Sequence, residues 1–149
     1  MLRTLLRSAL VALAEAPSEK EWAASINIAG RQRMLAQKMA KEIFQVQLKA
    51  DAETHRSSLK LSADTFDQTL KGLSDGDAKL GLPPTTDDAT RAQLAQVGKV
   101  WAEFRPLVDR VLKKEDLSAD DLARVAALNV QLLQEADKAV TLFQGLAGK

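Results

Sequence analysis

The sequence predicts an all-α protein folded as an antiparallel four-helix bundle. Along four segments, hydrophobic residues recur every three or four positions, as on helices that bury one face. Almost no stretch shows the strict polar–apolar alternation of a half-buried β-strand. Helix-capping residues precede the periodic segments, and turn-forming residues lie between them. These three observations together predict four helices packed around one core.

Size and composition limit what kind of protein this is. The 149 residues suit one domain, and the 46% that are hydrophobic are enough for a core. The 21 basic and 20 acidic residues are well mixed, so no broad basic face indicates nucleic-acid binding. The chain has no cysteine and a single histidine, His55, so it offers no thiolate or histidine cluster for a metal. We therefore expect no metal and no other cofactor.

Residues 1–17 are interpreted as either a signal peptide or a short N-terminal helix. Arg3, Arg7, a brief apolar run and small residues are typical of a secretory signal. Because that run is short and Glu15 lies within the expected cleavage site, an amphipathic helix packed on the bundle remains the alternative. A signal implies a periplasmic protein, and its absence a cytoplasmic one. No other stretch approaches the roughly 20 apolar residues needed to span a membrane, so the mature protein is expected not to span one.

The first helix is expected to begin after Ser18, which can form a capping box with Glu21. Its apolar residues cover about half of its circumference, as in a bundle helix. Gln32 lies within this apolar arc, and a buried glutamine needs hydrogen-bond partners. The partner would be a polar group on a neighbouring helix or in a pocket. Asn129 of the last helix is one candidate, although it could instead set the helix register or lie exposed.

A turn near Asp51 is expected to separate the first two helices, with Asp51 or Thr54 capping the second. The alternative, one unbroken helix from Ser18 to Leu73, would be about 80 Å long and too long for so small a domain. Residues 74–86 contain glycines, two prolines and threonines, which indicates a loop.

The third helix is predicted from a ridge of apolar residues between Leu94 and Val111. Pro106 interrupts this ridge and crowds the carbonyl of Ala102, so a kink is expected there rather than a helix end. Ser118 then marks the start of the fourth helix, with acidic residues in its first turn.

One face of the first helix combines polar residues with a glycine. At 100° per residue, five residues fall within about 80° of one another and form a stripe. This polar stripe consists of Asn27, Gly30, Met34, Gln37 and Lys41. A glycine inside a helix costs about 1 kcal/mol relative to alanine, which suggests that another helix or a small ligand approaches Gly30 closely. Arg33 lies about 60° to one side of Gly30, toward the apolar face, and Arg31 lies on the outer side. The alternative is that all of these are ordinary solvated surface residues.

The sequence of residues 26–41, Ile-Asn-Ile-Ala-Gly-Arg-Gln-Arg-Met-Leu-Ala-Gln-Lys-Met-Ala-Lys, resembles the signature of the PilJ-type sensor domain of type IV pilus chemotaxis transducers. A shorter related pattern, Asn-x-Ala-Gly-x-x-Arg-Met, is typical of periplasmic sensor regions of nitrate- and nitrite-responsive histidine kinases. It is matched by Asn27, Ala29, Gly30, Arg33 and Met34. Ala36 and Lys38 stand where Ser and Arg are common in the family. The resemblance implies that residues 18–149 form a PilJ-like four-helix-bundle sensor domain, with nitrate bound between two copies of the first helix.

We therefore expect a sensor of a small inorganic anion, nitrate or nitrite, that acts in chemotaxis, type IV pilus or nitrate signalling. A guanidinium can bind a planar oxyanion at two points, and two copies of Arg33 could meet at the axis of a homodimer. The expected ligand-binding residues are Arg33, Gly30, Asn27, Met34 and Gln37. The chain has no Gly-x-Gly-x-x-Gly, Walker or Gly-x-Ser-x-Gly motif, and we expect no enzyme activity.

A second interpretation makes the chain an interaction module without a small ligand. The motif would then be a packing surface for a partner protein, such as a pilus or receptor component. Arg33 would pair with a carboxylate of that partner or of its own bundle. The two interpretations differ in whether Arg33 is free to face its symmetry mate.

Overall fold

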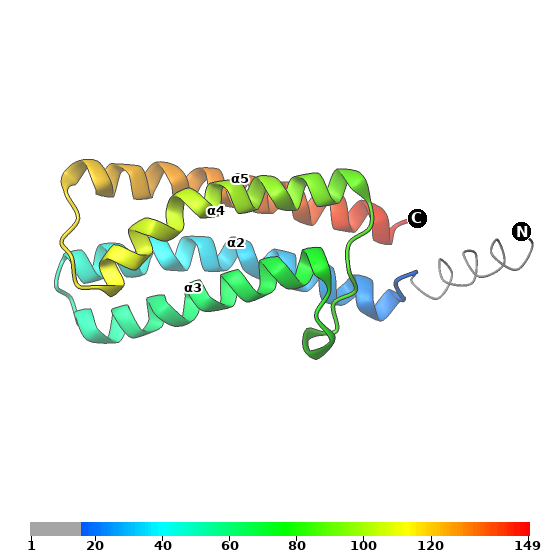
Figure 1. Cartoon of the computed structure of the whole chain (residues 1–149), viewed down its shortest axis with the longest axis horizontal. Helices are drawn as coiled ribbons and strands as arrows, with labels where there is room; N and C mark the ends of the chain where they lie inside the picture. Colours follow the sequence, from blue (N-terminus) through cyan, green and yellow to red (C-terminus); the bar gives the residue numbers. More distant parts are fainter. Residues whose placement is uncertain (1–15) are drawn as a thin grey trace, which may run out of the picture.

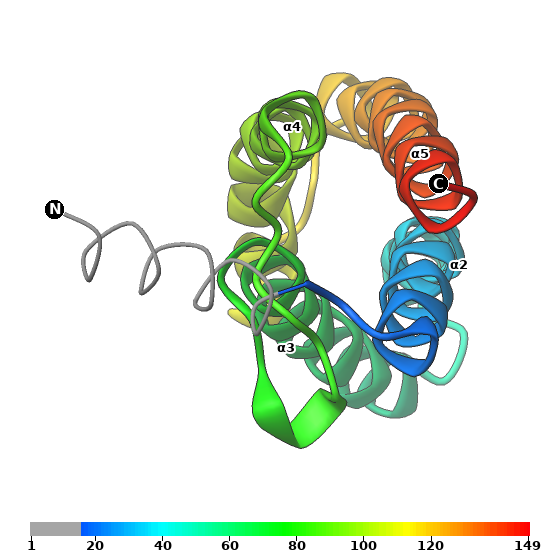
Figure 2. The same ribbon diagram turned by 90° about the vertical axis from the view of Figure 1, so that its right-hand side faces the viewer.

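The computed structural model describes residues 16–149, and the interpretation of residues 1–15 as a signal or helix lies outside them. The described chain forms four long helices and one short 3₁₀ turn (Figure 1). The elements are α2 (Glu19–Gln47), α3 (Ala52–Asp75), η1 (Ala78–Leu80), α4 (Asp88–Leu112) and α5 (Ala119–Ala147). Viewed along the bundle, the long helices follow one another around a ring, which brings α5 back beside α2 (Figure 2). This arrangement confirms the predicted antiparallel four-helix bundle.

Two of the predicted helix starts have the expected caps. Ser18 Oγ accepts a hydrogen bond from the backbone N–H of Glu21 at 3.1 Å, and the Glu21 carboxylate accepts one from the backbone N–H of Ser18 at 3.2 Å. Ser118 and Asp121 form the same reciprocal box at the start of α5. Both boxes satisfy amide groups that have no partner inside the helix.

The turn between α2 and α3 lies where it was expected, and Asp51 is at the predicted cap position, but neither Asp51 nor Thr54 caps the helix with its side chain. Asp51 occupies the cap position with φ of 50°, in the left-handed region, and its side chain accepts no bond from the helix backbone. A capping residue normally has an extended backbone, which directs its side chain at the free amides. Here the Asp51 carboxylate instead accepts a hydrogen bond from the Thr54 hydroxyl at 3.0 Å.

The core contains the apolar ridge that was predicted for the third helix. Its members are all buried, namely Leu94, Val97, Trp101, Phe104, Val108 and Val111. The rings of Phe66 and Trp101 lie 4.5 Å apart between centroids, which joins α3 to α4. Pro106 lies inside α4, which continues to Leu112 and changes direction along its length (Figure 1). As expected, Pro106 lies within the helix and does not end it.

The start of α2 and the end of α5 lie at the same end of the bundle (Figure 1). The loop between α3 and α4 crosses this end and contains η1, whose backbone amides donate to the Asp77 side chain. Among residues 16–149, no helix is both long enough and apolar enough to cross a membrane.

Candidate functional site

The polar stripe of α2 lies on the outside of the bundle. Because α2 packs between α3 and α5, the face opposite the core is left open (Figure 2). Asn27, Gln37 and Lys41 are exposed, Gly30 is partly exposed, and 58% of the Met34 surface is exposed. A methionine this exposed is an apolar group on an otherwise polar face. The predicted site residues therefore share one accessible face.

Arg33 crosses this face at Gly30. Its Nη1 donates to Asp137 Oδ1 of α5 at 2.7 Å, with side chains that are 42% and 60% exposed. Its Nη2 lies 3.6 Å from the place where a Cβ on Gly30 would be. Among residues 16–149, the side-chain group that approaches Gly30 is thus the guanidinium of Arg33. A distance of 3.6 Å is ordinary van der Waals contact, so this approach alone does not require a glycine.

Part of the Arg33 guanidinium is left without a partner. Asp137 engages only Nη1, and within residues 16–149 neither Nε nor Nη2 donates a hydrogen bond. Asn27 and Gln37 likewise make no side-chain hydrogen bond to the described residues. The structure therefore brings Arg33 and Gly30 together, while Asn27, Met34 and Gln37 lie on the same face without contacting Arg33 by hydrogen bonds.

On its other flank, α2 makes an ion pair that sequence reasoning missed. Lys38 Nζ lies 3.0 Å from Glu42 Oε1 and also donates to Ser58 Oγ at 2.7 Å and Ser62 Oγ at 3.0 Å on α3. Glu42 is 3% exposed and accepts a bond from Ser62 at 2.9 Å. The spacing of four residues between Lys38 and Glu42 was the signal available in the sequence.

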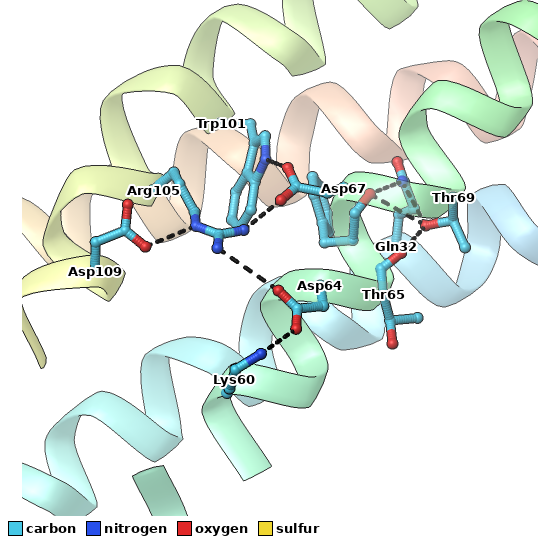
Figure 3. A network of polar contacts seen from close by, with 10 residues as sticks. Gln32, Lys60, Asp64, Thr65, Asp67, Thr69, Trp101, Arg105 and Asp109 are labelled. Atoms are coloured by element: carbon cyan, nitrogen blue, oxygen red, sulfur yellow. Dashed lines mark hydrogen bonds and ion pairs between the residues drawn. The ribbon is translucent and has the colours of Figure 1, made fainter. Parts of the chain in front are cut away.

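Gln32 is buried and meets polar groups of a neighbouring helix, as one alternative predicted. Its Nε2 donates to Thr69 Oγ1 at 3.0 Å and to the Phe66 carbonyl at 3.4 Å on α3 (Figure 3). The suggested pairing with Asn129 was wrong, because Gln32 faces α3 and not α5. Asn129 Oδ1 is buried and has no partner among the described residues.

In contrast to Arg33, another arginine of the bundle has a carboxylate partner for each of its guanidinium nitrogens. Arg105 of α4 contacts three carboxylates, with Nη2 3.6 Å from Asp64, Nε 2.9 Å from Asp109 and Nη1 bonded to Asp67 (Figure 3). It also lies over the Trp101 ring, 5.8 Å from the centroid. A hydrogen bond from Lys60, aided by the nearby Arg105 charge, lowers the pKa of Asp64. All three Arg105 nitrogens are occupied, so this cluster links α3 to α4 and is unsuited to an added anion.

Known proteins share the sequence pattern and the fold of this chain. Residues 17–140 match the PilJ family, described as the N-terminal region of type IV pili methyl-accepting chemotaxis transducers. The methyl-accepting chemotaxis protein McpN of Pseudomonas aeruginosa is 29% identical over 123 residues, which are 83% of this chain. Those residues are 22% of McpN, so the chain spans about a fifth of that relative's length.

The solved ligand-binding domain of the P. aeruginosa nitrate receptor McpN has a TM-score of 0.71 to this structure, at 29% identity. The match covers 82% of this chain and 94% of that domain, so the similarity extends through the bundle and is not confined to the α2 motif. A PilJ domain is a sensor module, in agreement with the expectation that the chain is not an enzyme. On these grounds, the chain belongs to the PilJ family of chemotaxis sensor domains.

Proposed function

We propose that this sensor domain binds nitrate or nitrite between the α2 helices of a homodimer. The observation that carries the proposal is the position of Arg33. Its guanidinium lies across Gly30 on the exposed stripe, and Nε and Nη2 have no partner among the described residues. The similarity to a domain named as part of a nitrate receptor supports the choice of ligand.

The chemistry of a guanidinium suits this ligand. Nitrate and nitrite are planar oxyanions, and two parallel N–H groups of an arginine can hold two oxygens at once. A single half-exposed arginine gains little from such a contact in water. Two copies of Arg33 facing each other across a two-fold axis would repel at short range, because Asp137 contacts each guanidinium only at Nη1, and an anion between them reduces that repulsion. Ligand binding and dimer formation are therefore coupled in this proposal.

The other stripe residues have roles in the same dimer. Gly30 carries no side chain, so two helices can come close where the anion lies. The amide groups of Asn27 and Gln37 can donate to the anion oxygens. Met34 is 58% exposed in the protomer, and a partner helix would bury it and keep water from the anion.

We place the domain in the periplasm, with the cytoplasm as the alternative. The support is the resemblance of its α2 motif to periplasmic sensor regions and the signal-like character of residues 1–17. A signalling or pilus protein would read the bound state. In that setting, the anion would act by shifting α2 against its mate.

The interaction-module alternative has one observation in its favour. Arg33 pairs with Asp137 of its own bundle at 2.7 Å, as that interpretation expects. In this case the stripe would be covered by a partner protein and the guanidinium would have no small ligand.

Titration calorimetry with nitrate, nitrite, sulfate and chloride tests the proposal, together with sedimentation of the protein with and without nitrate. Because the anion binds only the dimer, nitrate should shift the monomer–dimer equilibrium by mass action. Arg33→Ala should abolish the binding heat and the shift while the helical circular dichroism stays unchanged. Arg33→Lys should bind poorly, because an ammonium cannot make the planar two-point contact.

Arg31→Ala is the matched control, because Arg31 is exposed and forms no ion pair with residues 16–149. It removes the same charge from the same helix and should leave the nitrate response intact. A nitrate-induced dimer that survives Arg33→Ala refutes the site. No response of the wild type to any of the anions favours the interaction module.

A further inference from the structure

The carboxylate of Asp137 belongs to the immediate surroundings of the proposed anion site. It contacts Arg33 through Nη1 alone, at 2.7 Å. A guanidinium has five N–H donors, so Arg33 can bind an anion through Nε and Nη2 without releasing Asp137. An anion at this site therefore meets the negative charge of Asp137 as well as the positive charge of Arg33.

From this geometry, and resting on the proposed function, we infer that Asp137 makes the site prefer singly charged anions to doubly charged ones. In the dimer, two Arg33 and two Asp137 side chains contribute charges that sum to zero. The stripe residues nearest to Arg33, namely Asn27, Gly30, Met34 and Gln37, are neutral. The site thus binds an anion through the hydrogen bonds of the two Arg33 guanidinium groups. It has no excess positive charge that could neutralise a second negative charge on the anion.

Other charged groups nearby do not change this balance. Arg31 points about 160° away from Arg33 around the helix, and Lys41 is about 12 Å farther along it. Lys38 is held by Glu42, and Lys138 by Glu135 at 3.2 Å. Exposed charges at about 10 Å or more are largely screened at physiological salt.

The size of the effect follows from Coulomb's law. A carboxylate and an anion bound to the same guanidinium lie about 6 Å apart. Even with the screening of bulk water, two such carboxylates weaken the binding of a singly charged anion about tenfold and that of a doubly charged one about a hundredfold. The exclusion of water by Met34 would enlarge both factors. Asp137 therefore favours nitrate over sulfate by about tenfold through charge alone.

The test is the ratio of sulfate to nitrate affinity in Asp137→Asn, measured by calorimetry at constant ionic strength. Asparagine has nearly the same shape as aspartate and keeps an oxygen that can accept from Arg33. Both anions should bind more tightly to the variant, and the sulfate-to-nitrate ratio should rise about tenfold. Asp116→Asn is the control, because Asp116 is exposed in the loop before α5 and pairs with no cation in the described chain. It changes the net charge equally and should leave the ratio unchanged.

The outcomes separate this inference from the proposed function. If wild type binds nitrate and the ratio is unchanged in Asp137→Asn, the inference is overturned and the proposed function stands. An equal rise of the ratio in Asp116→Asn also overturns it, because net charge would then be the cause. If wild type binds neither nitrate nor nitrite, the proposed function fails and the inference fails with it.

Discussion

Within the described part of the chain, helix α2 makes two ion pairs that are close in sequence but differ in burial and in the number of groups they contact. Lys38 pairs with Glu42, whose side chain is 4% exposed, and both contact serines of α3. Arg33 pairs with Asp137 of α5, and both side chains are largely open to water. The first pair has its charges partly removed from solvent, and Lys38 Nζ and Glu42 Oε1 each meet several groups. Glu42 Oε2 is buried without a hydrogen-bond partner among the described residues. The second pair is a single contact that leaves donors unused.

This difference separates a structural pair from one available to a ligand. Breaking a pair that contains a buried charge leaves that charge uncompensated, and the cost is large. Breaking an exposed pair costs little, because water replaces the lost contact. A protein can therefore present Arg33 to a ligand at small cost in stability, whereas Lys38 must stay where it is. Measurements of stability distinguish the two kinds of pair.

Lys38→Met should be the most destabilising of these changes, because Glu42 would remain buried beside Ser62 without its cation. We expect a loss of about 2–3 kcal/mol in the free energy of unfolding, below the 3–5 kcal/mol of a fully buried pair because the Lys38 side chain is half exposed. Urea denaturation measures it. Replacing Glu42 by Leu in the same protein should restore most of the stability, since no buried charge then remains. A double variant as unstable as Lys38→Met would contradict this account.

Gly30→Ala should have a smaller effect of the opposite sign on the protomer. The added Cβ would lie 3.6 Å from Arg33 Nη2, which is ordinary contact, so the helix should gain about 1 kcal/mol. In the proposed dimer the same methyl group stands between two α2 helices, and the nitrate-induced association should weaken.

Gly98→Ala in α4 is the control for this change. Its Cβ would lie 3.9 Å from Leu70, so it should give a similar gain in thermal stability. Because Gly98 is far from the stripe, its nitrate response should be that of wild type. If Gly30→Ala also responds normally to nitrate, Gly30 does not lie in the interface.

The features that could be predicted from the sequence are those set by residues near one another in the chain. Capping at Ser18 and Ser118 depends on a residue three positions later, and the buried ridge of α4 depends on a local period. The left-handed backbone conformation of Asp51 could not be predicted from the sequence, because aspartate is common both at helix N-caps and in left-handed turns.

The environment of Arg33 was beyond sequence reasoning for a different reason. Its position on α2 followed from helical spacing, but its partner Asp137 is 104 residues away. That contact depends on how α5 is placed along α2, and no local pattern fixes such a register. The face of α2 that carries Arg33 could thus be predicted from the sequence. The Asp137 carboxylate, which offsets the charge of Arg33, could not.

The smallest effect is expected at the Arg33–Asp137 pair itself, and a double-mutant cycle measures it. Arg33→Ala, Asp137→Ala and the double variant, compared by urea denaturation without added anion, should give a coupling energy below about 1 kcal/mol, as for other exposed pairs. Raising the salt concentration should reduce this coupling further, because the Debye length falls to about 3 Å at 1 M. The corresponding cycle at Lys38 and Glu42 should keep most of its coupling in salt, since Glu42 is shielded from solvent. A coupling of about 2 kcal/mol or more at Arg33 and Asp137 would mean that Arg33 holds α2 against α5. The distinction between a structural pair and a ligand-accessible pair would then be wrong.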